Sequence, residues 1–222
     1  MAEPTAQRPI NDWLGEGIDQ DAEGEYSERS ATYASEVTNR SLLTVARLAD
    51  KPRLLGNVRR NLRMTLFRLE PNGEVETVHS RRQDQTGIQD VWKYLMQFRE
   101  LALVDRDARF AAVATQIIDR VEADPAAFAT SGYSVGEFLA EALAYPSLTA
   151  VLPRSGTVPT RYSGFSRGSQ LVRSAVTPPR PASSAGPTGT TPGRTSPASR
   201  PPSARSRPDC PPSRPSSSYA GA

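Results

Sequence analysis

Apolar residues recur at helical spacing through the middle of the chain. Between residues 105 and 124 they fall three or four positions apart, which places them on one face of an amphipathic helix. This stripe consists of Phe110, Val113, Ala114, Ile117, Ile118 and Val121. Similar patterns predict helices over about 31–50, 88–102 and 135–145. Thr86–Gln89 and Ser134–Glu137 match the capping box that starts many helices. The pattern therefore predicts a mainly α fold, a small helical bundle.

One stretch between these helices favours strands. Leu62, Met64 and Leu66 alternate with polar residues, and the segment Pro71–Gly73 is typical of a tight turn because proline presets φ and glycine permits a positive φ. The sequence thus predicts a β-hairpin at about 61–79. A helix from Leu54 to Leu69 is the alternative, and Gly56 counts against it.

Both ends of the chain lack the apolar residues needed for a core. Residues 1–30 are polar and acidic, and from Pro178 onward there is no Val, Ile, Leu, Met, Phe or Trp. Such segments bury too little apolar surface to offset the entropy of ordering them. We therefore expect an acidic disordered tail over 1–30, a helix-rich globular domain over 31–152 and a basic disordered tail over 153–222.

The N-terminal tail contains one short helical motif. Ile10, Trp13, Leu14 and Ile18 share one face at helical spacing, and acidic residues surround them. Helices that fold into a partner's groove have this pattern, so these four residues are predicted to bind a protein partner. The alternative is that Trp13 packs on the chain's own domain.

Charge divides the chain more sharply than the formal net charge of +3 suggests. Residues 1–36 carry nine acids and two arginines, whereas residues 153–222 carry ten arginines and a single acid, Asp209. Arginine binds phosphate in a bidentate manner, so a flexible arginine-rich tail is expected to hold nucleic acid without sequence preference. Predicted nucleic-acid-binding residues come from the tail and from a basic run before the turn: Arg194, Arg200, Arg205 and Arg207, with Arg53, Arg59, Arg60, Arg63 and Arg68.

The tail also offers ligands for proteins. Pro178–Pro181 and Pro212–Pro215 are PxxP elements of the kind that SH3-type grooves accept. Thr177, Thr191 and Ser196 each precede proline, and phosphorylation there would cancel part of the positive charge. Oppositely charged ends would also allow pairing within one molecule or between neighbours.

No catalytic, metal or cofactor pattern stands out. The chain has one histidine, His79, and one cysteine, Cys210, so neither a zinc cluster nor a disulfide framework is possible. Nucleotide-binding glycine loops and a serine elbow are lacking, and we expect His79 to be a solvated surface residue. The sequence predicts a protein that is not an enzyme, binds no cofactor and does not enter a membrane.

These features favour a non-enzymatic, nucleic-acid-associated assembly protein, for RNA or DNA, that forms homo-oligomers. A protein-interaction adaptor, using the Trp13 motif and the PxxP elements, is the alternative. The layout of acidic arm, compact domain and Arg/Ser/Pro tail resembles that of small viral nucleocapsid proteins and phosphoproteins. This resemblance of layout implies a place in a virion. A single cysteine, which excludes a disulfide framework, favours an intracellular location in the cytoplasm or nucleus.

Overall fold

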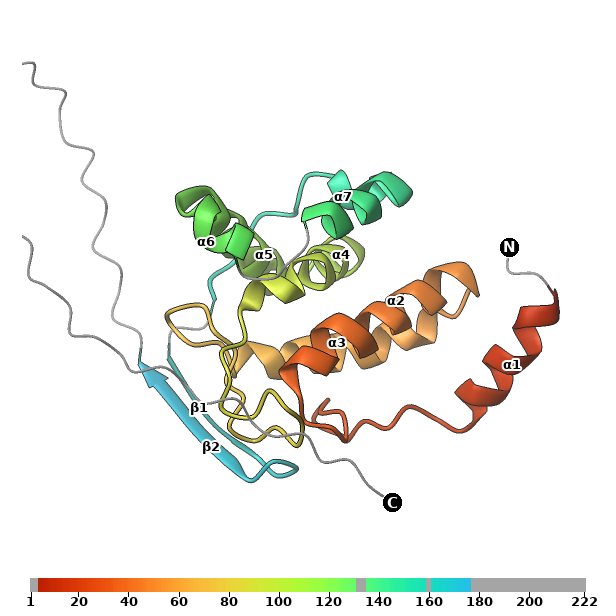
Figure 1. Ribbon diagram of the computed structural model, residues 1–222, viewed down its shortest axis with the longest axis horizontal. Helices are drawn as coiled ribbons and strands as arrows, with labels where there is room; N and C mark the ends of the chain where they lie inside the picture. The colour runs from red at the N-terminus through yellow and green to blue at the C-terminus, as the bar shows by residue number, and fades with distance from the viewer. Residues whose placement is uncertain (1–3, 131–134, 159–160, 177–222) are drawn as a thin grey trace, which may run out of the picture. The chain divides into compact units, whose positions relative to one another are not determined.

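The computed structural model describes residues 4–130, 135–158 and 161–176, and Figure 1 labels their helices and strands. The α-helices are α1 (Pro4–Gly15), α2 (Asn39–Leu48), α3 (Leu55–Leu66), α4 (Leu95–Asp105), α5 (Ala108–Ala123), α6 (Pro125–Thr130) and α7 (Val135–Ala144). A π-helical segment, Tyr33–Thr38, leads into α2, and short 3-10 helices occur at Pro52–Leu54, Val91–Tyr94 and Pro146–Thr149. The prediction of a mainly α fold is confirmed.

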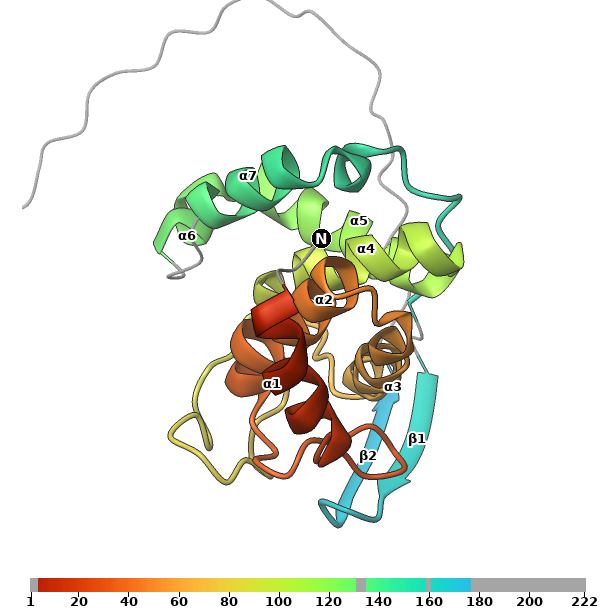
Figure 2. The ribbon, with the colours of Figure 1, turned by 90° about the vertical axis from the view of Figure 1, so that its right-hand side faces the viewer.

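The core lies among α2, α3, α4 and α5. In both ribbon views α4 and α5 run side by side, with α2 and α3 as a second pair next to them (Figures 1 and 2). The apolar stripe predicted for α5 is buried at Phe110, Val113, Ala114 and Ile117. Helix α5 begins at Ala108. Asp107 is its N-cap, and the Asp107 side chain accepts the backbone N–H of Arg109. The capping box predicted at Thr86 is not formed, since Thr86 has φ +60° and the next helical turn starts at Val91.

The hairpin predicted at 61–79 is wrong, because residues Leu55–Leu66 form helix α3. Val58, Leu62 and Leu66 are spaced four apart and buried against the core, so helical burial outweighs the short alternation around Met64. The predicted turn does occur after the helix. Glu70 and Glu74 are joined across it by a backbone hydrogen bond of 2.7 Å, but Leu69 and Val75 form only an isolated bridge.

A two-stranded antiparallel sheet lies instead in the segment expected to be a tail. Strand β1 (Arg161–Ser166) pairs with β2 (Leu171–Val176), with Arg161 opposite Val176 and Ser166 opposite Leu171. The assignment of 153–222 as disordered must therefore be corrected for residues 161–176. Composition concealed the strands, because serine, glycine and arginine separate their apolar residues. Residues 177–222 lie outside the described part of the chain.

The globular part also starts before residue 31. Tyr26 is 5% exposed, and its hydroxyl donates to Asn39 Oδ1 at 2.8 Å. Asn39 in turn donates to Asn61 Oδ1 at 2.9 Å, and Asn61 donates to the carbonyl of Gly24 at 3.0 Å. This buried polar chain fixes the segment 20–30 to α2 and α3, so the predicted tail over 1–30 is too long.

Candidate functional site

Helix α3 presents basic side chains on the face opposite its buried one. Arg60, Arg63 and Phe67 follow one another at intervals of three and four residues, which places them on one side of the helix. Arg53 precedes them in the 3-10 turn, and all four residues are exposed. The predicted basic run is thus brought to one surface by helical spacing rather than by alternation along a strand.

The arginines of this surface differ in how far they are neutralised. Arg59, beside the exposed face, donates two hydrogen bonds of 2.6 Å to the Asp105 carboxylate, which cancels its charge locally. Arg60 donates to the neutral Oε1 of Gln20 at 3.0 Å. Arg53 and Arg63 pair with no carboxylate in the described part of the chain. We call Arg53, Arg60 and Arg63 the α3 arginine face.

Arg68 does not belong to this surface, although the sequence grouped it with the others. Its residue is 7% exposed, and its Nη2 donates to Glu25 Oε1 at 2.8 Å. The guanidinium also lies against the ring of His79. Arg68 therefore serves as a buried counter-charge within the domain, and its assignment to a phosphate-binding surface is corrected.

His79 is buried as well, contrary to the expectation of a solvated histidine. Its side chain is 2% exposed, with Nε2 3.1 Å from Glu25 and Nδ1 2.9 Å from Glu76. Burial lowers the pKa of His79, but the hydrogen bonds to both carboxylates outweigh burial and the repulsion of Arg68, so the pKa is raised. The ring is enclosed by Glu25, Glu76 and Arg68, and in the described part of the chain it bonds to no serine or cysteine.

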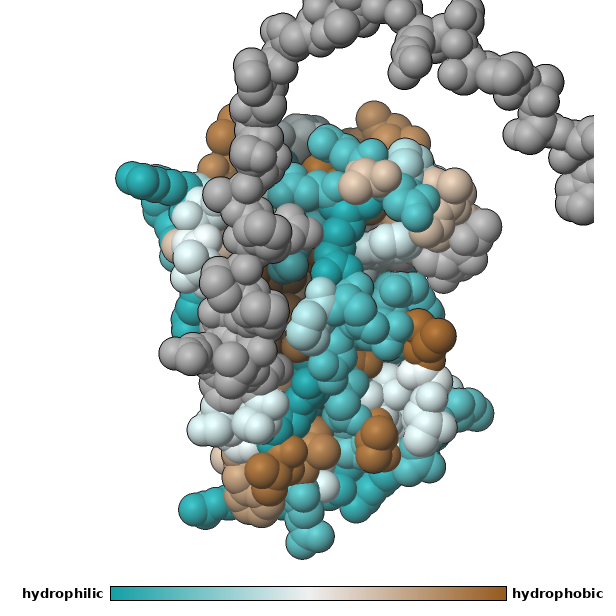
Figure 3. All heavy atoms as spheres, turned by 90° about the vertical axis from the view of Figure 1, so that its left-hand side faces the viewer, coloured by the Kyte–Doolittle hydropathy of each residue, from teal (hydrophilic) through white to brown (hydrophobic). Residues whose placement is uncertain are grey.

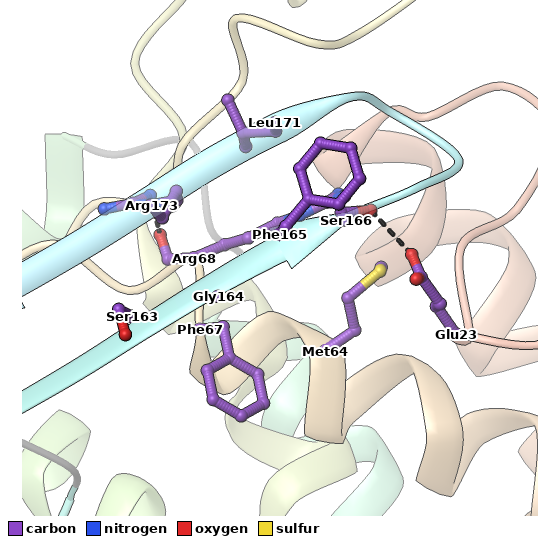
Figure 4. A pocket seen from close by; sticks show the side chains of 10 residues that line it. All are labelled: Glu23, Met64, Phe67, Arg68, Ser163, Gly164, Phe165, Ser166, Leu171 and Arg173. Carbon is purple, nitrogen blue, oxygen red and sulfur yellow. Dashed lines mark hydrogen bonds between the residues drawn. The ribbon is translucent and has the colours of Figure 1, made fainter.

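A cavity of about 320 Å³ opens between the end of α3 and the hairpin. Met64 and Phe67 line it from α3, while Phe165 and Leu171 line it from the two strands (Figure 4). The remaining wall is formed by Glu23, Arg68, Ser163, Gly164, Ser166 and Arg173. The cavity thus joins an apolar lining to the helix that carries the α3 arginine face.

The charged groups of the cavity wall already have partners. Glu23 accepts the Arg167 backbone N–H at 3.0 Å and the Ser166 hydroxyl at 2.9 Å. The Arg167 N–H outweighs the opposing effect of burial, so the pKa of Glu23 is lowered. Arg173 forms a 2.6 Å ion pair with Glu70 and donates to the carbonyl of Arg68. These contacts hold the hairpin on the helical part and leave mainly apolar surface open to the cavity.

The four residues of the predicted partner motif separate in the structure. Leu14 and Ile18 pack against the chain's own core, and Ile10 is half-buried. Trp13 on α1 is 69% exposed. The motif is therefore partly an anchor for its own domain, and Trp13 is its exposed member.

Several predicted features lie outside the described residues: Arg194, Arg200, Arg205, Arg207, both PxxP elements and the serines and threonines of the C-terminal segment. In the described ranges no cluster of three or more His, Cys, Asp or Glu side chains is arranged to hold a metal ion. None of the described helices has the length and apolar character needed to cross a bilayer.

Phe67 and Phe165 were missed in the sequence as possible site residues. Phe67 was assigned to a strand, whereas it caps α3 one turn after Arg63. Phe165 lies just before a short polar loop, Arg167–Gln170, which contains a glycine. The segments on either side of this loop contain aromatic and aliphatic residues. That pattern is typical of a hairpin and would have indicated the second half of the cavity.

Comparisons with known proteins identify no relative of this chain. No protein-family model matches it, and neither the curated proteins nor the solved structures contain a match. The function has to be inferred from the residues described above.

Proposed function

We propose that the protein is a non-enzymatic, nucleic-acid-associated assembly protein that binds the phosphate backbone without sequence preference. The observation that carries the proposal is the α3 arginine face. Two of its exposed arginines lie on α3 and Arg53 lies in the 3-10 turn before it, and none of the three has a carboxylate partner in the described residues. Guanidinium groups match phosphate oxygens in geometry and stay charged at every physiological pH.

The spacing of these groups suits a polymer of phosphates. A helix rises about 1.5 Å per residue, so Arg53 and Arg63 span roughly 15 Å along the surface. That length covers several phosphates of one strand, which are about 3.4 Å apart along a duplex axis. The arginine-rich segment 177–222 would add a second, sequence-independent contact.

For assembly we propose a different surface. Leu139 and Leu143 lie four positions apart on helix α7 and are 53% and 81% exposed. A second copy of the chain that covered this face would bury both leucines. Contacts between copies through α7 would array the α3 arginine face along one strand.

The test compares binding of a labelled single strand across a salt series. Changing Arg60→Gln together with Arg63→Gln removes two phosphate contacts, so the slope of log K against log salt should become shallower by about 1.4. The matched control is Arg109→Gln, which removes an exposed arginine from α5. An unchanged slope for the double variant, or an equal loss in the control, would contradict a role for the α3 face.

A protein-interaction adaptor is the second candidate, because Trp13 is 69% exposed on a helix flanked by acidic residues. Tryptophan is enriched among residues that dominate binding energy at interfaces. In this case the protein would bind no nucleic acid even at low salt, and a captured protein partner would be lost with Trp13→Ala.

A further inference from the structure

The α3 arginine face leads directly to the cavity. Phe67 follows Arg63 by four residues on the same side of the helix, and Phe67 lines the cavity together with Met64. A strand whose phosphates contact Arg60 and Arg63 would therefore pass the mouth of the cavity. The lining of the cavity then determines which part of such a strand can enter it.

The lining favours a flat, weakly polar group. Phe67 is 49% and Phe165 57% exposed, so both rings present surface to a ligand. Met64 and Leu171 supply further apolar wall, and Figure 4 shows the two rings coming from different elements, the end of α3 and strand β1. The volume of about 320 Å³ is at the lower end of pockets that bind small molecules.

We propose that this cavity binds an unpaired base of single-stranded nucleic acid, whose backbone continues along α3 past Arg63 and Arg60. The inference rests on the proposed function and names its substrate class. Aromatic side chains beside a basic groove are the usual means of binding single strands, because every base has a π-face. Bases of a duplex are already stacked and paired, so a duplex has no base free to enter.

The charges near the cavity favour phosphate on the side of α3. Glu23 is the carboxylate of the wall and lies at the hairpin turn, where it bonds to Ser166 and to the Arg167 backbone N–H. Arg63 lies one turn before Phe67 and attracts phosphate from the opposite side. The hydrogen-bonding groups of Glu23 and Arg173 are occupied by Ser166 and Glu70, so the site has little means of distinguishing one base from another.

The distribution of hydrophobic residues on the hairpin side of the molecule is consistent with a small binding site. Figure 3 looks onto the side of the molecule that carries the hairpin, and among the coloured residues in sight there, hydrophobic groups are separated by hydrophilic ones. A large continuous apolar face would have favoured a protein partner instead. An apolar peptide side chain in the cavity is the competing occupant, and the experiment distinguishes it.

The experiment uses the full chain and two fluorescent oligonucleotides of about 12 nucleotides, a length within usual single-strand site sizes. One has a mixed sequence, and the other is abasic over its central positions but has the same phosphates. Phe67→Ala and Phe165→Ala should each weaken binding of the mixed-sequence strand by roughly 5- to 150-fold and leave the abasic strand unaffected. Phe165→Trp should restore binding and show quenched tryptophan emission on addition of the mixed-sequence strand.

Val172→Ala is the control, because Val172 is 73% exposed on the same hairpin and does not line the cavity. It should bind both strands like the unaltered protein, and thermal unfolding would verify that each variant is folded. If the phenylalanine variants bind both strands normally while Arg60→Gln with Arg63→Gln does not, the base site is refuted and the proposed function stands. If the unaltered protein binds neither strand at low salt, the base site and the proposed function are both refuted. An apolar side chain of a peptide is then the favoured occupant of the cavity.

Discussion

At the residue scale, the buried group formed by Glu25, Arg68, Glu76 and His79 makes stability depend on pH. Two carboxylates and two cations balance only while His79 is protonated, and its deprotonation leaves a net negative charge among side chains that are almost fully buried. Burial penalises such an imbalance more than exposure would.

The pKa of His79 is raised in the folded protein above its ordinary value of 6.5. Its stabilising effect is therefore complete below about pH 6.5 and is lost as the pH rises through the folded value. The free energy of unfolding should fall by up to about 1.4 kcal/mol per pH unit over that range. Urea unfolding at a series of pH values measures this directly.

His79→Gln is the variant that isolates the effect, because glutamine keeps hydrogen-bonding capacity and cannot titrate. His79 is the only histidine of the chain, so the dependence above pH 6.5 should disappear in the variant. In the unaltered protein the pKa values of Glu25 and Glu76 are lowered, so their contribution to stability is lost as pH falls below 4.5. The hydrogen bonds to His79 are the largest lowering cause for both, so this acidic dependence should weaken in the variant, while Arg68 keeps part of it. A variant that keeps the full slope above pH 6.5 would exclude His79 as its source.

At the element scale, the close approach of the segment 20–30 to α3 depends on Gly24. This glycine has φ +101°, and a Cβ there would come within 2.5 Å of the backbone carbonyl group of Arg60. Gly24→Ala combines left-handed strain with a backbone clash and should lower the free energy of unfolding by at least about 3 kcal/mol. Gly17→Ala is the matched control, because Gly17 has φ +92° but open space around it, and it should cost only about 1 kcal/mol.

The contacts of this segment explain why the sequence favoured a hairpin over the helix at 54–69, which was the alternative and is the correct one. Asn61 and Thr65 lie on the buried side of the helix, where Asn61 bonds to Asn39 and to Gly24. Two polar residues in the apolar stripe hid its helical period, so Leu62, Met64 and Leu66 gave a strand pattern instead. Helix α5 was predicted correctly because its buried face is apolar throughout.

The candidate site was only partly predictable for a similar reason. Arginines of α3 were identified from their charge, but charge alone does not separate the exposed Arg63 from the buried Arg68. That distinction depends on Glu25, which is 43 positions away in the chain. The cavity joins residues even farther apart, Phe67 and Phe165, and neither local periodicity nor composition gives their proximity.

At the scale of the whole molecule, opposite charges join distant parts of the described chain. Glu23 binds the hairpin turn at Ser166 and Arg167, and Glu70 binds Arg173. The hairpin that precedes the arginine-rich segment is thus held by acidic residues of the helical part. A chain shortened for binding studies should end after Val176. An end at residue 152, where the sequence analysis placed the boundary of the domain, would remove six of the ten residues that line the cavity.

A chain ending at Val176 separates the two basic surfaces of the proposed function. The deletion removes six arginines and one acid, with Arg180, Arg194, Arg200, Arg205, Arg207 and Arg214 as the arginines lost. If all six contact phosphates, the slope of log K against log salt should become shallower by about 4, while the penalty for Phe165→Ala stays the same. Binding titrations of the shortened chain with the mixed-sequence and abasic strands measure both quantities. Loss of the difference between the two strands on deletion would show that base recognition belongs to residues 177–222 and not to the cavity.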